Sequence, residues 1–301
     1  MRATFIQTSR RWKNLTALAL AGSLALAACQ SAPSPTPQEK PEATPRDAGN
    51  KIHVTPRDTV QQPATPGIND LNAKGFSPLH EAVLANKVRR VRDLIEQGAS
   101  VNLYSKSRMN PLYYAADCNR LEILKMLLDA GAWIDAPSDR GWTPLLIAAE
   151  RGHTRIVAEL LRRGANVHTA ETWGWTALHS AAVNGHQKVL RLLIEYGADV
   201  NTRQFPDTVL HQAAIKGQVC TAEILIDHGA LIDQMNTSGA MPLHLAISYS
   251  HKDVINLLLD RGADPNAVAS NGFTPLITAW KWPGVQDRPT IALLLRLYGA
   301  E

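Results

Sequence analysis

A block of about 33 residues recurs along most of this chain, and no other feature constrains its fold as strongly. One copy runs from Ser138 to His168. Aligned on the leucine after the Thr-Pro pair, successive copies are 33, 33, 33, 32, 33 and 33 residues apart, at Leu79, Leu112, Leu145, Leu178, Leu210, Leu243 and Leu276. Aligned on the glycine of the closing Gly-Ala pair, the copies are 33, 33, 33, 32, 33 and 37 residues apart, at Gly98, Gly131, Gly164, Gly197, Gly229, Gly262 and Gly299. Two independent anchors agree, so we expect seven copies of one structural unit.

Each unit reads as two short helices joined by a reversal. Thr143 and Pro144 predict a helix start, because the hydroxyl can accept from an orphan backbone N–H and proline gives up a donor that had no partner. Gly152 stands where the chain must reverse, which favours a left-handed conformation. The other units have Asn86, Asn119, Gly185, Gly217 and Ser250 there. The second helix has an apolar stripe of Ile156, Val157, Leu160 and Leu161, which only stacking of the units can bury.

The unit resembles the ankyrin repeat. The Thr-Pro-Leu-His core of that family is recognisable as Ser77-Pro-Leu-His80, Thr176-Ala-Leu-His179, Thr208-Val-Leu-His211 and Met241-Pro-Leu-His244, and in weaker form at Asn110, Thr143 and Thr274. The resemblance implies an all-α ankyrin-repeat solenoid of seven helix-turn-helix units joined by β-hairpin loops. The expected units are residues 68–102, 103–135, 136–168, 169–201, 202–233, 234–266 and 267–301.

The first 28 residues have the features of an export signal. Four basic residues precede an apolar stretch, from Leu15 to Ala28, that is too short to span a bilayer comfortably. The sequence Leu26-Ala27-Ala28-Cys29 resembles the bacterial lipobox, which implies removal of residues 1–28, lipid attachment at Cys29 and a place in the cell envelope. By the sorting rule of that family, Gln30 implies the outer membrane, with the protein facing the periplasm. The alternative is an ordinary signal peptide with an unrelated cysteine.

Residues 29–67 form a proline-rich linker after the expected lipid-anchored cysteine. Prolines alternate there with Ser, Thr, Gln and charged residues, which leaves almost nothing to bury. We expect this segment to be extended. It either holds the repeats away from a lipid surface or is only a tolerated spacer.

The charge balance argues against nucleic acid as a partner. The chain has 31 Lys and Arg residues against 27 Asp and Glu. The whole excess lies in the expected signal, at Arg2, Arg10, Arg11 and Lys13. Without that segment the charges balance and no basic run remains, so nothing would neutralise a phosphate backbone.

The ten histidines invite a metal or catalytic interpretation, but most have a structural one. The resemblance implies that His80, His179, His211 and His244 bridge neighbouring hairpins, and His153, His186 and His251 follow the reversal position. No zinc-protease, phosphate-loop, dinucleotide-loop or nucleophile-elbow motif is present in the sequence. We therefore expect no catalytic residue, no metal and no cofactor, and a protein that is not an enzyme.

The resemblance also implies where a protein partner would bind. In ankyrin repeats the concave face is formed by the hairpin tips and the ends of the first helices. Here those positions include Met109, Arg140, Trp142, Glu150, Arg151, Trp173, Trp175, Asn184, Phe205 and Tyr249. Tryptophan and arginine are favoured at the centres of interfaces. Trp142 and Trp175 could instead pack along the hairpins, so Trp173, nearer the tip, is the stronger candidate.

The last unit departs from the pattern. Four extra residues lie between its helices, and Leu293 and Leu297 stand where earlier units have mostly charged residues. A terminal repeat needs a polar outer face, which these leucines do not supply. Either they form an end-cap docking surface or the inserted loop folds over them.

Taken together, the sequence predicts a non-enzymatic, lipid-anchored adaptor of the bacterial envelope that binds a protein through its concave face. One alternative is an immunity or inhibitor protein that masks a periplasmic toxin or hydrolase. Another is an accessory factor that protects a periplasmic oxidoreductase. The oligomeric state stays open, and the partner cannot be named because a fold does not imply a function.

Overall fold

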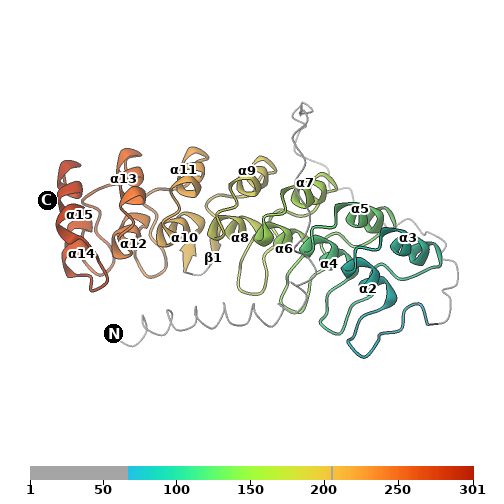
Figure 1. Cartoon of the computed structure of the whole chain (residues 1–301). Helices are drawn as coiled ribbons and strands as arrows, with labels where there is room; N and C mark the ends of the chain where they lie inside the picture. Colours follow the sequence, from blue (N-terminus) through green and yellow to red (C-terminus); the bar gives the residue numbers. More distant parts are fainter. Residues whose placement is uncertain (1–66, 205) are drawn as a thin grey trace. The chain divides into compact units, whose positions relative to one another are not determined.

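The computed structural model describes residues 67–204 and 206–301, which contain fourteen helices in seven successive pairs (Figure 1). The first helices of the pairs are α2 (Pro78–Leu84), α4 (Pro111–Asp117), α6 (Pro144–Arg151), α8 (Ala177–Val183), α10 (Val209–Lys216), α12 (Pro242–Ser248) and α14 (Pro275–Lys281). The second helices are α3 (Val88–Glu96), α5 (Leu121–Asp129), α7 (Thr154–Arg162), α9 (Gln187–Glu195), α11 (Val219–Asp227), α13 (Lys252–Asp260) and α15 (Arg288–Leu297). The expected all-α solenoid is confirmed.

The helices form two layers. Each first helix packs against the first helices of its neighbours and against its own second helix, and the second helices from α3 to α13 pack along the array in the same way. The loops that join successive pairs project together on the side away from the second helices (Figure 1). Each pair therefore contacts mainly its neighbours, as in other repeat architectures.

Local sequence sets where the helices begin and reverse. The Thr143 side chain accepts from the backbone N–H of Leu146 at 3.4 Å, and Pro144 occupies the first turn of α6. Gly152, at the end of the helix, has a φ of 73°. Its counterparts Asn86 and Ser250 reach 54° and 62° although they carry side chains. The predicted reversal conformation is therefore confirmed, and asparagine tolerates it better than most residues.

One hydrophobic core runs through the array from Ile68 to Ala300. The predicted stripe of α7 lies in it, with Ile156, Val157 and Leu160 fully buried and Leu161 nearly so. Every residue of this core lies within the compact unit Gln61–Glu301. This region therefore supplies the whole core of the described residues, and we expect it to fold without the rest of the chain.

Tight turns close the loops, and neighbouring tips are bonded to each other. In unit three, for example, the Ser138 N–H donates to the Trp142 carbonyl at 2.9 Å. The Thr172 N–H then donates to the Arg140 carbonyl of the preceding tip at 3.0 Å. The loop that is one residue short is different, because its arms pair as β1 (Arg203–Gln204) and β2 (Asp207–Thr208).

Several predictions fall on residues 1–66, outside the described part of the chain. They concern the export signal, lipid attachment at Cys29 and the linker. Within residues 67–204 and 206–301, no helix combines the length and apolar character needed to cross a bilayer.

Candidate functional site

The hairpin tip of unit four presents the most exposed tryptophan of the described residues. Trp173 has 72% of its surface exposed. Its backbone is nevertheless held firmly, because Glu171 Oε1 accepts from the N–H groups of Trp173 at 2.8 Å and Trp175 at 3.1 Å. Glu171 itself is buried. Hydrogen bonds thus fix the backbone of the tip, while the Trp173 ring stays exposed.

The other predicted aromatic and apolar residues near the tips are half-buried. Met109 and Trp142 pack against the core. The Trp175 ring lies 5.8 Å from the His179 ring, close to edge-on. These side chains therefore pack along the hairpins, as the alternative interpretation of Trp142 and Trp175 predicts. Part of the surface of each side chain is still exposed to solvent.

A charged group lies at the ends of α4 and α6. Arg151 Nε donates to Asp117 Oδ1 at 2.8 Å, so the pair links unit two to unit three. The Glu150 carboxyl is half-buried beside them. Burial raises its pKa, Arg151 opposes the rise, and the like charge of Asp117 adds to it. Arg151 is thus bonded to Asp117, and its charge also acts on the Glu150 carboxyl.

The remaining predicted residues are spread over units three to six. Arg140 and Asn184 are exposed, and Asn184 Nδ2 donates to the Ser180 carbonyl at 2.9 Å. Tyr249 is 55% exposed, and its ring stacks on His251 with 6.3 Å between centroids. Phe205 lies outside the described residues. The predicted set is therefore a row over several units and does not converge on one cavity.

The buried histidines complete the helix starts and join neighbouring units. His211 Nε2 lies 3.1 Å from the Ala240 carbonyl, to which it must donate. Nδ1 of the neutral ring therefore accepts from the Thr208 N–H at 3.3 Å. Nε2 of His80 and of His244 bridges to the carbonyls of Met109 and Phe273 in the same way, but Nδ1 of His244 has no hydrogen-bond partner among the described residues, because Met241 at the start of α12 forms no side-chain cap. Burial lowers the pKa of His80 and His211 from 6.5 to about 4, and the bonds to Met109 and Ala240 oppose the shift.

His179 departs from this scheme. Its Nδ1 accepts from the Thr176 N–H at 3.4 Å, but its Nε2 has no hydrogen-bond partner among the described residues. The unit that follows is the one with the short hairpin. Burial lowers the pKa of His179 to about 4.

Three further histidines form hydrogen bonds to the preceding unit, not to the following one. Nε2 of His153, His186 and His251 lies 2.8 to 3.0 Å from the carbonyls of Asp117, Glu150 and Ile215 in the preceding unit. Seven histidines thus have structural partners. No group of three or more His, Cys, Asp or Glu side chains in the described ranges is arranged to hold a metal ion.

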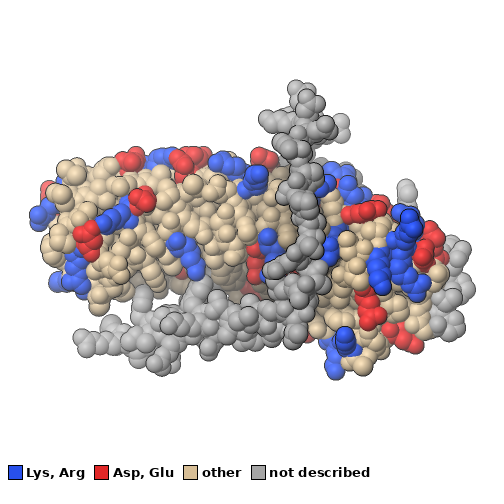
Figure 2. Space-filling view, in the orientation of Figure 1, with Lys and Arg blue, Asp and Glu red and all other residues tan. Residues whose placement is uncertain are grey.

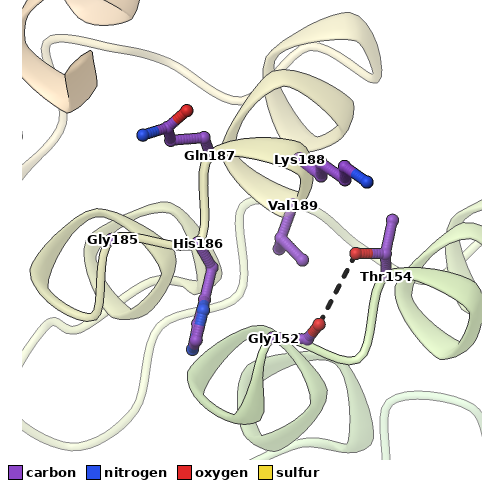
Figure 3. Close-up of a pocket in the computed structure, with 7 residues that line it drawn as sticks. All are labelled: Gly152, Thr154, Gly185, His186, Gln187, Lys188 and Val189. Carbon is purple, nitrogen blue, oxygen red and sulfur yellow. Dashed lines mark hydrogen bonds between the residues drawn. The ribbon is translucent and has the colours of Figure 1, made fainter. Parts of the chain in front are cut away.

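A hollow lies between the reversal loops of units three and four and measures about 300 Å³ (Figure 3). Gly152, Thr154, Gly185 and the start of α9 line it, and Thr154 Oγ1 donates to the Gly152 carbonyl at 3.5 Å. His186 lies so near that a Cβ at Gly152 would be 2.6 Å from its Nδ1. The lining residues include no carboxylate and no paired nucleophile and base, so the hollow offers no catalytic arrangement.

The end-cap leucines are open to solvent. Leu293 is 61% exposed and Leu297 is 76% exposed. The inserted loop therefore does not cover them, which removes the second of the two alternatives raised by the sequence.

Sequence reasoning missed two residues that support the candidate surface. Glu171 was not singled out, yet it braces the Trp173 tip. Asp117 was also missed, although it binds Arg151. A signal did exist for Asp117, because it occupies the same helix-end position as Glu150 one unit earlier. For Glu171 the signal was its charge: it is acidic, whereas the equivalent first residue of other tips is an uncharged polar residue, as at Asn72, Ser105, Ser138 and Asn236.

These contacts define a stacked array of helix-turn-helix repeats, joined by hairpin tips and by histidine bridges from one unit to the next. The profile described as "Ankyrin repeats (3 copies)" matches residues 57–138, 133–204 and 202–269, so the chain belongs to the ankyrin-repeat family. Ankyrin repeats are typically modules for protein–protein interaction, and their relatives are generally non-catalytic scaffolds.

Individual relatives agree with this assignment. The chain is 44% identical over 48 residues to the ankyrin repeat protein FPV230 of fowlpox virus (strain NVSL), a match that covers 16% of this chain and 26% of the viral protein. The ankyrin repeat domain of Bcl-3, from the IkappaB protein family, is similar with a TM-score of 0.67 and 26% identity, covering 74% of this chain and 99% of that one. The human ASB11 ankyrin repeat domain is similar with a TM-score of 0.63 and 29% identity, and the match covers 75% of this chain and 99% of that one.

Proposed function

We propose that this protein is a non-enzymatic, lipid-anchored adaptor of the bacterial envelope that binds a protein partner through its hairpin tips and the ends of its first helices. The observation that carries the proposal is Trp173, which is 72% exposed on a tip held by the buried Glu171. A large aromatic ring on a rigid support loses little conformational entropy on binding, and tryptophan is the residue type most enriched in binding hot spots.

The polar neighbours of Trp173 favour a protein as the ligand. Arg140 and Arg151 are exposed on unit three, where Glu150 supplies an acceptor, and Asp117 of unit two supplies another. This mixture extends over several units, which suits an interface of many residues better than a small molecule. The described histidines with strongly lowered pKa are occupied in helix caps, which favours a binding role over catalysis.

Lipid attachment at Cys29 is tested separately from partner binding. The full chain, expressed in a bacterium with a radiolabelled fatty acid, should incorporate the label and sediment with the envelope. A Cys29→Ser variant should lose the label. Label that persists in this variant, or that is missing from the wild type, contradicts the anchoring.

Partner binding is tested by capture from envelope extract with the fragment of residues 61–301. We expect one dominant protein to be captured by the wild type and to be reduced at least about tenfold by Trp173→Ala, since a hot-spot tryptophan contributes about 2 kcal/mol or more. Trp133→Ala is the matched control, because Trp133 is also exposed, at 58%, but follows the Gly131-Ala132 pair away from the hairpin tips. Equal loss in both variants, or in neither, rejects this surface.

The identity of the captured protein then separates the three roles. A toxin or hydrolase indicates an immunity or inhibitor protein, and an oxidoreductase indicates an accessory factor. Any other single envelope protein fits the general adaptor.

A further inference from the structure

The hairpin tips of the first three units are basic. Residues 73–75, 106–108 and 139–141 form these tips, and they carry four exposed cations that we call the basic row: Lys74, Lys106, Arg108 and Arg140. Figure 2 shows Lys and Arg side chains at the lower edge of the N-terminal end of the array, where Figure 1 draws the first tips. The tips of units six and seven, residues 237–239 and 270–272, carry no charged residue. Charge is therefore concentrated on one part of the row of tips.

Stacking of the units makes the basic row continuous, although the sequence contains no run of basic residues. The Lys106 N–H donates to the Gly75 carbonyl at 2.9 Å, which joins the first two tips. Arg108 Nε donates to Asp139 Oδ1 at 2.9 Å, which joins the second tip to the third. The third tip is bonded in turn to the tip of unit four. The basic row therefore leads directly to the exposed Trp173 ring.

Three members of the basic row have their charge free for a ligand. Asp139 is the one acidic residue on these three tips, and it is already bound to Arg108. Four cations and one acid leave a net charge of +3. Within the described residues, no ion pair includes the side chains of Lys74, Lys106 or Arg140. Carboxylates of a ligand could thus pair with them without breaking an existing ion pair.

The spacing of the tips constrains the shape of such a ligand. Lys74, Arg140 and Trp173 hold the same position in units one, three and four, because they are 66 and 33 residues apart. Stacked helices advance about 10 Å per unit, so these three side chains extend over about 30 Å. A polyproline II chain rises about 3.1 Å per residue with three residues per turn, so every third side chain points the same way at intervals of about 9 Å. A segment of about ten residues in this conformation matches the row in length and in period.

Acidic side chains beside the basic row favour a protein segment over a phosphate surface. The Glu150 carboxyl, at the end of α6, is half-buried and forms no ion pair among the described residues. Glu81 on α2 is exposed and accepts from Asn72 Nδ2 at the base of the first tip. A membrane surface or a nucleic acid would bring a continuous series of phosphates against these carboxylates, and like charges suppress such partners. A protein segment can place neutral or basic side chains there.

We propose that the basic row and Trp173 bind an acidic segment of the partner protein in an extended, polyproline-like conformation. Its carboxylates lie about three residues apart and pair with the cations of the row, and an apolar side chain at its end packs on Trp173. This inference rests on the proposed function, since it states the chemistry of the partner at the same surface.

The probe is a fluorescent peptide of ten residues with aspartate at positions one, four and seven, leucine at position ten, and proline or alanine elsewhere. Its binding to the full chain in non-ionic detergent is followed by fluorescence anisotropy. We expect binding that weakens at least about fivefold between about 0.05 and 0.5 M NaCl, because salt screens exposed charges. The same peptide with lysine in place of aspartate should not bind. No binding of the aspartate peptide, or equal binding of the lysine peptide, overturns the proposal.

Variants matched in charge locate the contact. The double variant Lys74→Ser and Arg140→Ser should weaken the peptide at least about fivefold, since exposed ion pairs are individually weak and two are lost. The control is the double variant Arg155→Ser and Lys188→Ser, which removes the same net charge from exposed positions on the second helices α7 and α9. It should leave the affinity unchanged, and circular dichroism should be alike in all proteins. Equal weakening by both double variants shows unspecific attraction and overturns the proposal.

A further variant and a competitor separate this inference from the proposed function. Trp173→Ala should weaken the peptide at least about fivefold, as expected of an interface tryptophan. If capture of the partner requires Trp173 but the aspartate peptide does not bind, the proposed function stands and this inference falls. If the peptide binds as expected but capture does not require Trp173, the proposed function falls. Displacement of the peptide by phosphatidylglycerol micelles at equal concentration of charge identifies a lipid surface and overturns the choice of a protein segment.

Discussion

Acid should destabilise the array because three of its histidines are buried in the neutral form. The pKa of His80, His179 and His211 falls from 6.5 to about 4 on folding, chiefly through burial. The unfolded chain therefore binds more protons than the folded chain between these values, so stability is complete above the unfolded pKa and is lost as the pH falls towards the folded one. Protonation would also put a proton on Nδ1, the atom that accepts from the Thr208 N–H in the case of His211.

The size of the effect follows from the shift. For one such histidine the loss is about 2 kcal/mol between about pH 7 and pH 5, and about 3 kcal/mol once the pH is below 4. Buried carboxyl groups act in the opposite sense at lower pH. Burial raises the pKa of Asp135, Asp207 and Asp233, so the folded chain takes up protons there more readily than the unfolded one. Single-histidine variants are therefore needed to isolate the histidine contribution.

The assay is urea unfolding of the fragment 61–301 at a series of pH values, followed by circular dichroism and by tryptophan fluorescence. We expect the loss of unfolding free energy between about pH 7 and pH 5 to be smaller by about 2 kcal/mol in His211→Leu than in the wild type. Coincident transitions by the two probes are required, since repeat arrays can unfold in parts. The reasoning is refuted if the variant and the wild type lose stability in parallel over this range.

Two further comparisons use neighbouring units as controls, both at neutral pH. His211→Leu should destabilise the fragment by about 1 kcal/mol more than His179→Leu, because only the first change removes an Nε2 hydrogen bond, and the Ala240 carbonyl then keeps only its bond from the Asn236 N–H. Equal midpoints in urea would show that the Nε2 bond contributes nothing. Gly152→Ala should cost about 2 kcal/mol and Gly185→Ala about 1 kcal/mol, since both positions have a left-handed φ and only the first Cβ would strike His186. Equal costs would show that the His186 ring moves aside freely.

The helix pairs and their order could be read from the sequence because the signals that set them are local. Thr143 and Pro144 begin α6, Gly152 ends it, and the stripe of α7 is buried as its spacing predicts. Each of these depends on residues within one or two turns of one another. The family assignment rests on the same repeated signals, so it too was available from sequence. The candidate tip residues were located by position alone, and their binding role stays a prediction.

Only the tertiary structure decided how each unit meets the next. Three of the four core histidines bridge to the following hairpin, but His179 has no Nε2 partner where the next loop is one residue short. The sequence determined the array of seven units, and with it which side chains recur at each position. Tertiary structure determined that Glu171 braces Trp173 and that Leu293 and Leu297 stay open. These outcomes depend on the path of each loop and on the reach of individual side chains, which no periodic pattern specifies.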